Sequence, residues 1–527
     1  MYRGIIALKE FKISAATPVK PNDRYWQFCI GSCHAALALR ADYQKQLKQV
    51  HDELGFKRVR FHGLFDDDMH IITTLKSFMG YIPGSSKIKT QSFYHVALVY
   101  DALLDMGIKP FVELGFMPSA IARGKHTVFA YKGNVTPPRE WREWENLIRD
   151  FIRFLIARYG KQEVESWYFE VWNEPDLRGF FWAGSKEDYF QLYKSTVQAI
   201  KSIDPNIRVG GPATSQNRWL TDMKNFCARE KLPLDFLSTH HYPGDDVGIP
   251  ILTWPNIKRI LTTARKNPGL NVTQTYHKMM YRPEILPLIK KDSMYNQALQ
   301  ARREAGDMPL FYTEWNVNPT CTAPAHDTTQ SASYIVKHMM ESQYIMDGAS
   351  FWCFSDIFEE STIFPQPFTG TFGLMNIYGI PKPSYWAFYL LNQLGDERLE
   401  LPTTHEDIEM AAFKSDHAMQ LLVYRQQYTP EKHGKEEVVF SIEEARRVKA
   451  VRRLRIDAGS GNPIDVWKGM GSPETLSRQQ VEEIKRVSRP VEETVPFEQA
   501  DGAVHIRTAL DTNDVHLILV DFEEEAK

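Results

Sequence analysis

The sequence lacks an excess of charge of either sign. Its 63 Lys and Arg residues nearly balance 66 Asp and Glu residues, giving a formal net charge of −3 and a pI near 6.6. Such a balance provides no long-range attraction toward nucleic acid or an anionic membrane surface. We therefore predict neither nucleic-acid nor membrane partners.

Long apolar stretches are also missing. No run reaches the about 20 apolar residues that a membrane-spanning helix requires. The first residues, MYRGIIALKEFK, contain neither a long apolar segment nor a small-residue cleavage site, so no signal peptide is visible. We expect a cytoplasmic protein, or a periplasmic or secreted one if a leader was removed.

Cysteine is scarce, and the count is odd. Five cysteines are scattered over the chain, at Cys29, Cys33, Cys227, Cys321 and Cys353. In a long chain this pattern is typical of reduced core thiols rather than a disulfide framework. Cys29 and Cys33 would share one face of a predicted strand, but we assign the pair no metal or redox role.

Aromatic residues, by contrast, are abundant. They make up 12% of the chain and include 12 Trp. Sugar-binding clefts use aromatic faces, but Trp and Tyr also fill large cores, so this abundance alone assigns no function. The length of 527 residues exceeds one ordinary core, which predicts one large domain and a smaller one.

Short apolar strands alternate with longer helical stretches between about residues 28 and 358. Near-continuous apolar runs that end in polar or small residues are typical of strands buried on both faces. No glycine-rich phosphate loop follows the first strand, so the pattern favours a (β/α)₈ barrel over an open doubly wound sheet. The predicted strands span residues 28–34, 58–63, 110–116, 168–174, 207–213, 235–242, 310–316 and 348–354.

The pattern changes after a predicted helix over about residues 382–391. Short alternating strands with turn signals between them predict a β-sandwich, to which the N-terminal IIALKEFKIS would add a strand. We therefore predict an α/β fold, with a catalytic (β/α)₈ TIM barrel over residues 15–390. The accessory β-sandwich domain would cover residues 391–527 together with the N-terminal strand in residues 1–14.

The strongest local motif is VWNEPD, residues 171–176, at the end of the fourth predicted strand. In a barrel, this end of the strand faces the catalytic mouth. Pro175 predicts an extended backbone at Glu174 and prevents a helix from starting there. Asn173 is placed to hydrogen-bond a sugar hydroxyl while Glu174 reaches the glycosidic oxygen.

A second motif, YTEWN at residues 312–316, ends the seventh predicted strand. Strands four and seven lie across a barrel from one another, so Glu174 and Glu314 can point into one cleft. Hydrolysis of a glycoside with retention needs two carboxyl groups roughly 5–5.5 Å apart, one protonated and one ionised. A lone strand-end glutamate is more often a structural ion-pair partner, but two at these positions favour catalysis.

At these motifs the sequence resembles the β-xylosidases of glycoside hydrolase family 39. The resemblance spans nearly the whole chain, whereas that to the α-L-iduronidases of the same family is weaker. It implies a retaining, exo-acting hydrolase that releases terminal β-D-xylose from xylo-oligosaccharides without metal or cofactor. Glu174 would be the acid/base and Glu314 the nucleophile. The landmarks are FVELGFMPSAIA, GNVTPP, WYFEVWNEPDL, VGGPA, DFLSTHHY, FYTEWN, AHDTT, FWCFSDIFEE and IPKPSYWAFYLLNQLG.

The resemblance also implies the residues that contact the sugar in the −1 subsite. Asn173 would contact the 2-hydroxyl, Tyr242 would hydrogen-bond the nucleophile, and Glu360 would bind hydroxyls of the nonreducing sugar. The run Phe180-Phe181-Trp182 would help to build the pocket wall. The full predicted set of substrate contacts is His62, Phe116, Asn173, His240, Tyr242, Trp352, Glu359 and Glu360.

Each of these residues could instead have a purely structural role. His62 and His240 could be hydrogen-bonded core histidines, and Trp352 could be barrel packing. Two departures from the family pattern fall near the same subsite: Phe61 replaces a glycine, and the run 318–321 (Asn-Pro-Thr-Cys) lacks a family aromatic. Both leave the reaction type intact but bear on which sugar is bound.

Three alternative functions remain. The same mechanism could act on an α-L-arabinoside, β-glucoside, β-galactoside or uronide, although no basic residue adjoins the motifs above to bind a uronide carboxylate. The second alternative is a sugar-binding protein with a degenerate active site. The third is a metallohydrolase built from His62, His70, His240 and His241, which is disfavoured because neighbouring strand residues point to opposite faces. A homo-oligomer is compatible with the resemblance.

Overall fold

The computed structural model describes residues 8–244 and 283–523, apart from 77–79, 81, 361–363, 405, 430, 432, 444 and 501, together with Lys258, Thr262 and Lys266. Residues 1–7 of the predicted N-terminal strand segment lie outside the described residues. None of the helices in the described part of the chain combines the length and the apolar composition needed to cross a bilayer.

Eight parallel strands close into a barrel. Their order around the barrel is their order along the chain, so each strand pairs with the next and the last pairs with the first. Each of the eight predicted strands overlaps one of them, which confirms the (β/α)₈ barrel and excludes the doubly wound sheet. The strands are β3 (Cys29–His34), β4 (Arg58–His62), β7 (Lys109–Leu114), β10 (Tyr168–Val171), β11 (Arg208–Ser215), β12 (Phe236–His241), β13 (Leu310–Trp315) and β14 (Gly348–Phe351).

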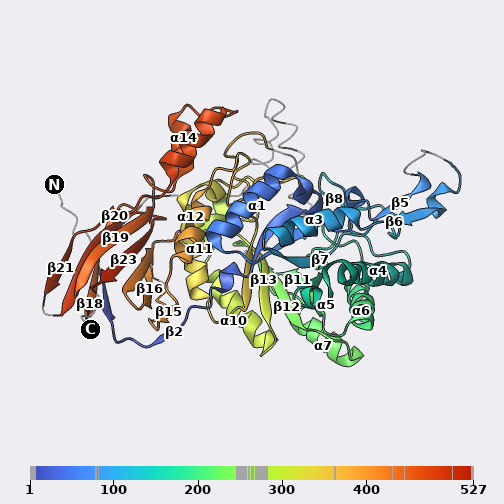
Figure 1. Cartoon of the computed structure of the whole chain (residues 1–527), viewed down its shortest axis with the longest axis horizontal. Helices are drawn as coiled ribbons and strands as arrows, with labels where there is room; N and C mark the ends of the chain where they lie inside the picture. Colours follow the sequence, from blue (N-terminus) through green and yellow to red (C-terminus); the bar gives the residue numbers. More distant parts are fainter. Residues whose placement is uncertain are drawn as a thin grey trace.

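Helices cover the outside of this barrel (Figure 1). Helix α4 is amphipathic: it buries Trp144, Ile148, Phe151 and Leu155 on one face, and Gly160 follows its last turn at positive φ. The barrel helices are α1 (Ala41–Leu54), α3 (Tyr94–Asp105), α4 (Trp141–Tyr159), α5 (Lys161–Glu165), α6 (Lys186–Ile203), α7 (Leu220–Glu230), α10 (Ser293–Ala305), α11 (Thr329–Glu341) and α12 (Pro383–Asn392). Two small hairpins, β5 (Ile72–Thr74) with β6 (Lys89–Gln91) and β8 (Thr127–Val128) with β9 (Gly133–Asn134), were not predicted.

The barrel interior changes from apolar to polar along the strands. Side chains alternate along a strand, so every second residue faces inward. Near the amino ends of the strands, Phe111, Tyr168, Phe236 and Phe311 pack together as an aromatic layer. Two residues further along, β7, β10 and β13 present Glu113, Glu170 and Thr313. This polar layer lies directly beneath the carboxyl ends of the strands.

The C-terminal part and two N-terminal strands, β1 (Leu8–Ser14) and β2 (Val19–Pro21), form two further sheets around one core. Phe440 and Ile506 of one sheet share a hydrophobic cluster with Leu421 and Ile518 of the other, which fits the predicted β-sandwich. One sheet has the order β1 (Leu8–Ser14), β18 (Glu436–Glu443), β22 (Ala503–Leu510), β21 (Phe497–Ala500). The other has the order β2 (Val19–Pro21), β15 (Glu397–Leu399), β16 (Glu409–Ser415), β17 (Ala418–Tyr424), β23 (Val515–Phe522), β19 (Val448–Ile456), β20 (Glu493–Thr494).

Two helices that the sequence analysis missed lie between β19 and β20. These are α13 (Pro463–Gly469) and α14 (Arg478–Ser488), and α14 projects from the sandwich in Figure 1. Ser477 and Gln480 form a capping box at the start of α14, so a readable signal was present. Their apolar faces pack against Phe368 and Ile380 in the segment that follows β14.

Candidate active site

The two predicted glutamates lie at the carboxyl ends of β10 and β13, and both are nearly buried. Glu174 is 6% exposed and Glu314 is 5% exposed. The prediction of an extended backbone at Glu174 was wrong, because its φ is +40°. The Glu174 amide donates to the Ala213 carbonyl at 2.9 Å, and this contact with β11 holds the residue in the left-handed region.

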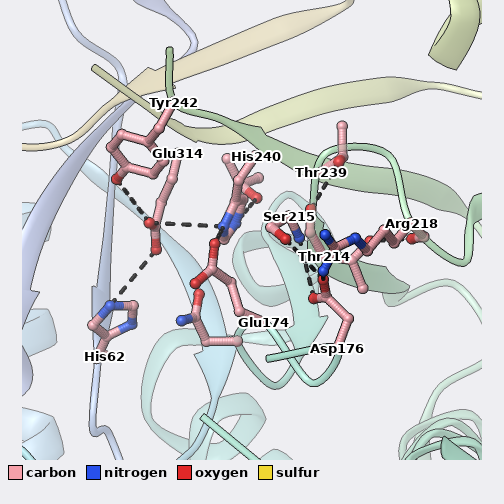
Figure 2. Close-up of polar contacts among 12 residues, drawn as sticks. His62, Glu174, Asp176, Thr214, Ser215, Arg218, Thr239, His240, Tyr242 and Glu314 are labelled. Carbon is pink, nitrogen blue, oxygen red and sulfur yellow. Dashed lines mark hydrogen bonds and ion pairs between the residues drawn. The ribbon is translucent and has the colours of Figure 1, made fainter. Parts of the chain in front are cut away.

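The carboxyl groups of Glu174 and Glu314 converge on the ring of His240 (Figure 2). One oxygen from each carboxyl group and a His240 ring nitrogen all lie within 4.8 Å of one another. His240 Nδ1 is 2.9 Å from Glu174 Oε1 and 3.7 Å from Glu314 Oε2. This separation is close to that of carboxyl pairs that act with retention, and well short of the about 6.5–9.5 Å of inverting pairs.

Hydrogen-bond donors surround the Glu314 carboxylate. Arg60 Nη1 donates to its Oε1 at 2.9 Å, and the Tyr242 hydroxyl donates to its Oε2 at 3.0 Å. His62 Nε2 lies 3.6 Å from the same Oε1. A guanidinium and a phenol on one buried carboxylate stabilise its negative charge.

Glu174 lies in the opposite electrostatic environment. Burial raises the pKa of Glu174 well above its usual range, and the nearby Asp176 carboxylate raises it further. Asp176 accepts hydrogen bonds from the Ser215 amide and hydroxyl at 3.1 and 2.8 Å. Burial also lowers the pKa of His240 to about 4, so its imidazole is neutral near pH 7. The site therefore pairs a carboxyl group whose pKa is raised with a second one that accepts hydrogen bonds from a guanidinium and a phenol.

Arg60 is the main site residue that the sequence analysis missed. Its side chain is fully buried, and its Nε donates to Glu170 Oε2 at 2.6 Å. Its Nη2 lies 2.9 Å from Glu113 Oε2 and 2.8 Å from Asn173 Oδ1, and its Nη1 reaches Glu314. The prediction that no basic residue adjoins the motifs was therefore wrong, because Arg60 contacts Asn173 and Glu314 in the folded barrel. Arg60 is two residues before His62, and strand alternation was the signal that placed both inside the barrel.

Phe61, between these two residues, points out of the barrel. It is buried, and its ring lies 6.5 Å from that of Tyr100 on α3. This departure from the family pattern therefore lies between sheet and helix rather than beside the sugar subsite, contrary to our expectation. Pro319, the other departure, is exposed after β13.

An aromatic wall stands beside the glutamates. The ring of His62 lies 4.6 Å from that of Trp352, 5.8 Å from that of Phe116 and 6.0 Å from that of Phe181. The structure thus brings together four residues predicted for the pocket. Trp182 packs behind this wall, where its ring lies 4.9 Å from that of Trp172.

The two adjacent glutamates after β14 lie in different places. Glu360 Oε1 is 3.9 Å from His62 Nε2, and burial, with the charge of Glu314, raises the pKa of Glu360 well above its usual range. Glu359 instead forms an ion pair with Arg40 Nη1 at 3.1 Å. The structure therefore brings Glu360, but not Glu359, next to the predicted site.

Two groups of described side chains have the spacing of metal ligands. The first is Glu174, His240 and Glu314, and the second is Asp457, Asp514 and His516 in the sandwich. Positive charge opposes a cation at both. Arg60 donates to Glu314 in the first, and in the second burial together with Arg453 and Arg455 lowers the pKa of His516 to about 3.

The four histidines of the metallohydrolase alternative do not form one group: His62 and His240 lie beside Glu314, whereas His70 and His241 lie elsewhere. His241 Nδ1 contacts Gln297 Oε1 of α10 at 2.5 Å, on the opposite side of β12 from Glu174. The ring of His70 lies 5.2 Å from that of His95. Neither residue belongs to a metal-like group among the described residues.

Replacing Arg60 with methionine is expected to destabilise the fold by about 3–5 kcal/mol, because buried carboxylates lose their counter-charge. Urea unfolding followed by tryptophan fluorescence measures the loss. Arg153→Met is the matched control, since Arg153 makes an exposed ion pair with Asp150 and should lose under about 1 kcal/mol. Equal losses in the two variants would contradict the central role of Arg60.

Comparisons with known proteins agree with this geometry. The sequence profile of Glycosyl hydrolases family 39 matches residues 9–279 and 270–505. The chain is 40% identical over 478 residues to a β-xylosidase of Caldicellulosiruptor saccharolyticus, covering 90% of each chain. It is 34% identical over 504 residues to a β-xylosidase of Geobacillus stearothermophilus, covering 94% of this chain and 92% of that one.

Solved structures show the same relationship over the whole chain. The crystal structure of a family 39 enzyme from Xanthomonas axonopodis pv. citri superposes with a TM-score of 0.80 at 28% identity, covering 99% of this chain and 100% of that one. A monomeric β-xylosidase from Caulobacter crescentus CB15 superposes with a TM-score of 0.79 at 29% identity, covering 98% and 100%. This chain therefore belongs to glycosyl hydrolases family 39 and is an O-glycosyl hydrolase.

Proposed function

We propose that this chain is a retaining, exo-acting β-xylosidase that releases terminal β-D-xylose from xylo-oligosaccharides. The observation that carries the proposal is the approach of Glu174 and Glu314 to within 4.8 Å in opposite environments. Two relatives that cover at least 90% of this chain are β-xylosidases, which supports the choice of sugar.

The reaction takes two displacements. The Glu314 carboxylate attacks the anomeric carbon, while Glu174 gives its proton to the departing glycosidic oxygen. The resulting ester removes the charge of Glu314, so Glu174 ionises more readily in the glycosyl-enzyme than in the free enzyme. Glu174 then takes a proton from water as that water attacks the anomeric carbon, and xylose leaves with its original configuration.

Asn173 supports a carbohydrate in this cleft. Its Oδ1 accepts a hydrogen bond from Arg60, which fixes the amide so that Nδ2 faces the other way. This buried Nδ2 has no hydrogen-bond partner among the described residues. An unpaired buried donor costs about 1–3 kcal/mol, so a sugar hydroxyl placed here would bind strongly. We assign this position to the 2-hydroxyl.

The surrounding side chains favour a pentose over a uronic acid. A uronide needs a free cation for its carboxylate, and the donors of Arg60 are already committed to Glu113, Glu170, Glu314 and Asn173. Bulky rings line another part of the cleft, where His62 packs against Trp352. Xylose has no substituent on C5, so such a wall accommodates it better than a hexose.

A panel of p-nitrophenyl glycosides tests the choice of sugar. We expect the wild type to release p-nitrophenol from the β-D-xyloside at least about tenfold faster, by kcat/KM, than from the β-glucoside, β-galactoside or a β-uronide. Faster release from another sugar would keep the mechanism and change the substrate. No release from any of them, or from xylo-oligosaccharides, would indicate a sugar-binding protein instead.

A further inference from the structure

Both ring nitrogens of His240 have polar partners. Nδ1 lies 2.9 Å from Glu174 Oε1, and Nε2 lies 3.2 Å from Thr313 Oγ1. Burial lowers the pKa of His240 to about 4, so near pH 7 the ring carries a single proton. The nitrogen that bears this proton decides how His240 acts on Glu174, because one tautomer donates to Oε1 and the other accepts from it.

The partners of Thr313 settle which nitrogen is protonated. Its hydroxyl lies 2.9 Å from Glu170 Oε1, and Glu170 Oε2 is ion-paired with Arg60 Nε at 2.6 Å. A carboxylate in an ion pair has no proton to donate, so Thr313 must be the donor in this contact. A hydroxyl has one hydrogen, which leaves Thr313 Oγ1 only as an acceptor for His240. Nε2 is therefore the protonated nitrogen, and Nδ1 presents a lone pair.

We propose that Thr313 and Glu170 are positioning residues that hold His240 in its Nε2-protonated tautomer, so that Nδ1 accepts a hydrogen bond from the protonated carboxyl group of Glu174. The inference rests on the proposed acid/base role of Glu174. It adds a chain of three hydrogen bonds, from Glu174 through His240 and Thr313 to Glu170, that keeps the acid proton in place before substrate reacts.

The opposite tautomer would act against the acid. A proton on Nδ1 would be donated to Glu174 Oε1 and would stabilise its ionised form, while the lone pair of Nε2 would face that of Thr313 Oγ1. Glu314 Oε2 is no substitute partner for Nδ1, since it lies 3.7 Å away and already accepts from Tyr242. The hydrogen-bond chain thus maintains the proton on Glu174, while Arg60 and Tyr242 maintain the charge on Glu314.

Among the described residues, the Thr313 hydroxyl has hydrogen-bond contacts with Glu170 and His240 alone, and Glu170 keeps its ion pair with Arg60 when that hydroxyl is removed. The titratable and charged groups that face Glu174 or lie beside it are Arg60 on β4, Glu113 on β7, Asp176 after β10, Arg218 after β11, His240 and Tyr242 at the end of β12, Glu314 on β13 and Glu360 after β14. A shift in the titration of Glu174 on mutating Thr313 therefore reports the tautomer of His240.

Thr313→Val tests the inference, because valine keeps the shape of threonine and removes the hydroxyl. The measurement is the pH profile of kcat/KM for xylobiose, whose basic limb reports the acid of the free enzyme. With no acceptor at Nε2, His240 can donate from Nδ1, so we expect the basic limb to move to lower pH by about one to two units. Thr313→Ser retains the hydroxyl and should keep the wild-type limb.

Glu174→Gln separates this inference from the proposed function. If Glu174→Gln hydrolyses xylobiose as fast as the wild type, the acid role itself is wrong. If that variant is inactive but Thr313→Val keeps the wild-type basic limb, the acid role stands and the tautomer inference is overturned. A purely structural role for Thr313 would lower the rate without moving the limb.

The tautomer can also be read directly in the wild-type protein. In ¹⁵N spectra of histidine-labelled enzyme, the resonances of His240 are those lost in His240→Gln. We expect the pattern of a neutral ring protonated at Nε2. A ring protonated at Nδ1 would overturn the inference even if both Thr313 variants fail to fold.

Discussion

In the Glu314→Ala variant, release of p-nitrophenol from the β-D-xyloside is expected to fall by on the order of 10⁵-fold. In the proposed mechanism Glu314 is the nucleophile and Glu174 acts from the other side of the anomeric carbon, so alanine leaves no group to attack that carbon. Added azide should restore release, because the small anion fits the space of the lost carboxylate. It attacks from the same face, so the product should be α-xylosyl azide.

The matched control for this variant is Glu230→Ala. Glu230 is a surface glutamate on α7 that pairs with Lys194 at 3.0 Å, and its loss should leave the rate unchanged. Circular dichroism shows whether Glu314→Ala is folded, which we expect because Arg60 keeps Glu113 and Glu170 as partners. Substantial activity without azide, or a β-configured azide product, would remove Glu314 from the nucleophile role.

The barrel could be predicted from the sequence because its strands are buried on both faces. Such strands give continuous apolar runs, and the runs at 168–174 and 310–316 overlap β10 and β13. Strand order in a (β/α)₈ barrel follows chain order, so locating the strands also placed Glu174 and Glu314 on opposite sides of one mouth. The longer sandwich strands were also readable, because each contributes several apolar residues to a single core.

The charge network beneath the site could not be predicted in the same way. Arg60, Glu113, Glu170 and Thr313 come from four strands and meet only when the barrel closes. In the sequence each is a polar residue on a different strand, and no local spacing links them. Alternation does show that each faces inward, but the identity of its partner depends on the register between distant strands.

The backbone at Glu174 was mispredicted for a related reason. The rule for a residue before proline disfavours the right-handed helical region, which we interpreted as an extended conformation. The hydrogen bond from the Glu174 amide to Ala213 on β11 selects the left-handed region instead. A tertiary contact therefore decided between two conformations that the local sequence allows. Phe61 lies next to His62 in sequence but faces the opposite way, because side chains alternate along β4.

Glu174→Ala should affect substrates according to their leaving groups. Xylobiose releases a sugar alkoxide that needs a proton, so kcat/KM is expected to fall by on the order of 10³-fold. A dinitrophenyl β-xyloside releases a stable phenolate and should keep kcat/KM close to that of the wild type. Its kcat should nevertheless fall, because the second displacement has lost its base, and a burst of phenolate should precede slow turnover.

Azide distinguishes the two glutamates by the configuration of the product. In Glu174→Ala, Glu314 still forms the glycosyl-enzyme, and azide attacks that intermediate from the face that Glu174 occupied, giving β-xylosyl azide. In Glu314→Ala a single displacement gives the α-anomer. The same anion should thus yield opposite anomers, because in the proposed mechanism the two carboxyl groups act on opposite faces of one carbon. Identical anomers from both variants, or equal losses of kcat/KM for xylobiose and the dinitrophenyl xyloside in Glu174→Ala, would contradict the assignment of acid/base and nucleophile.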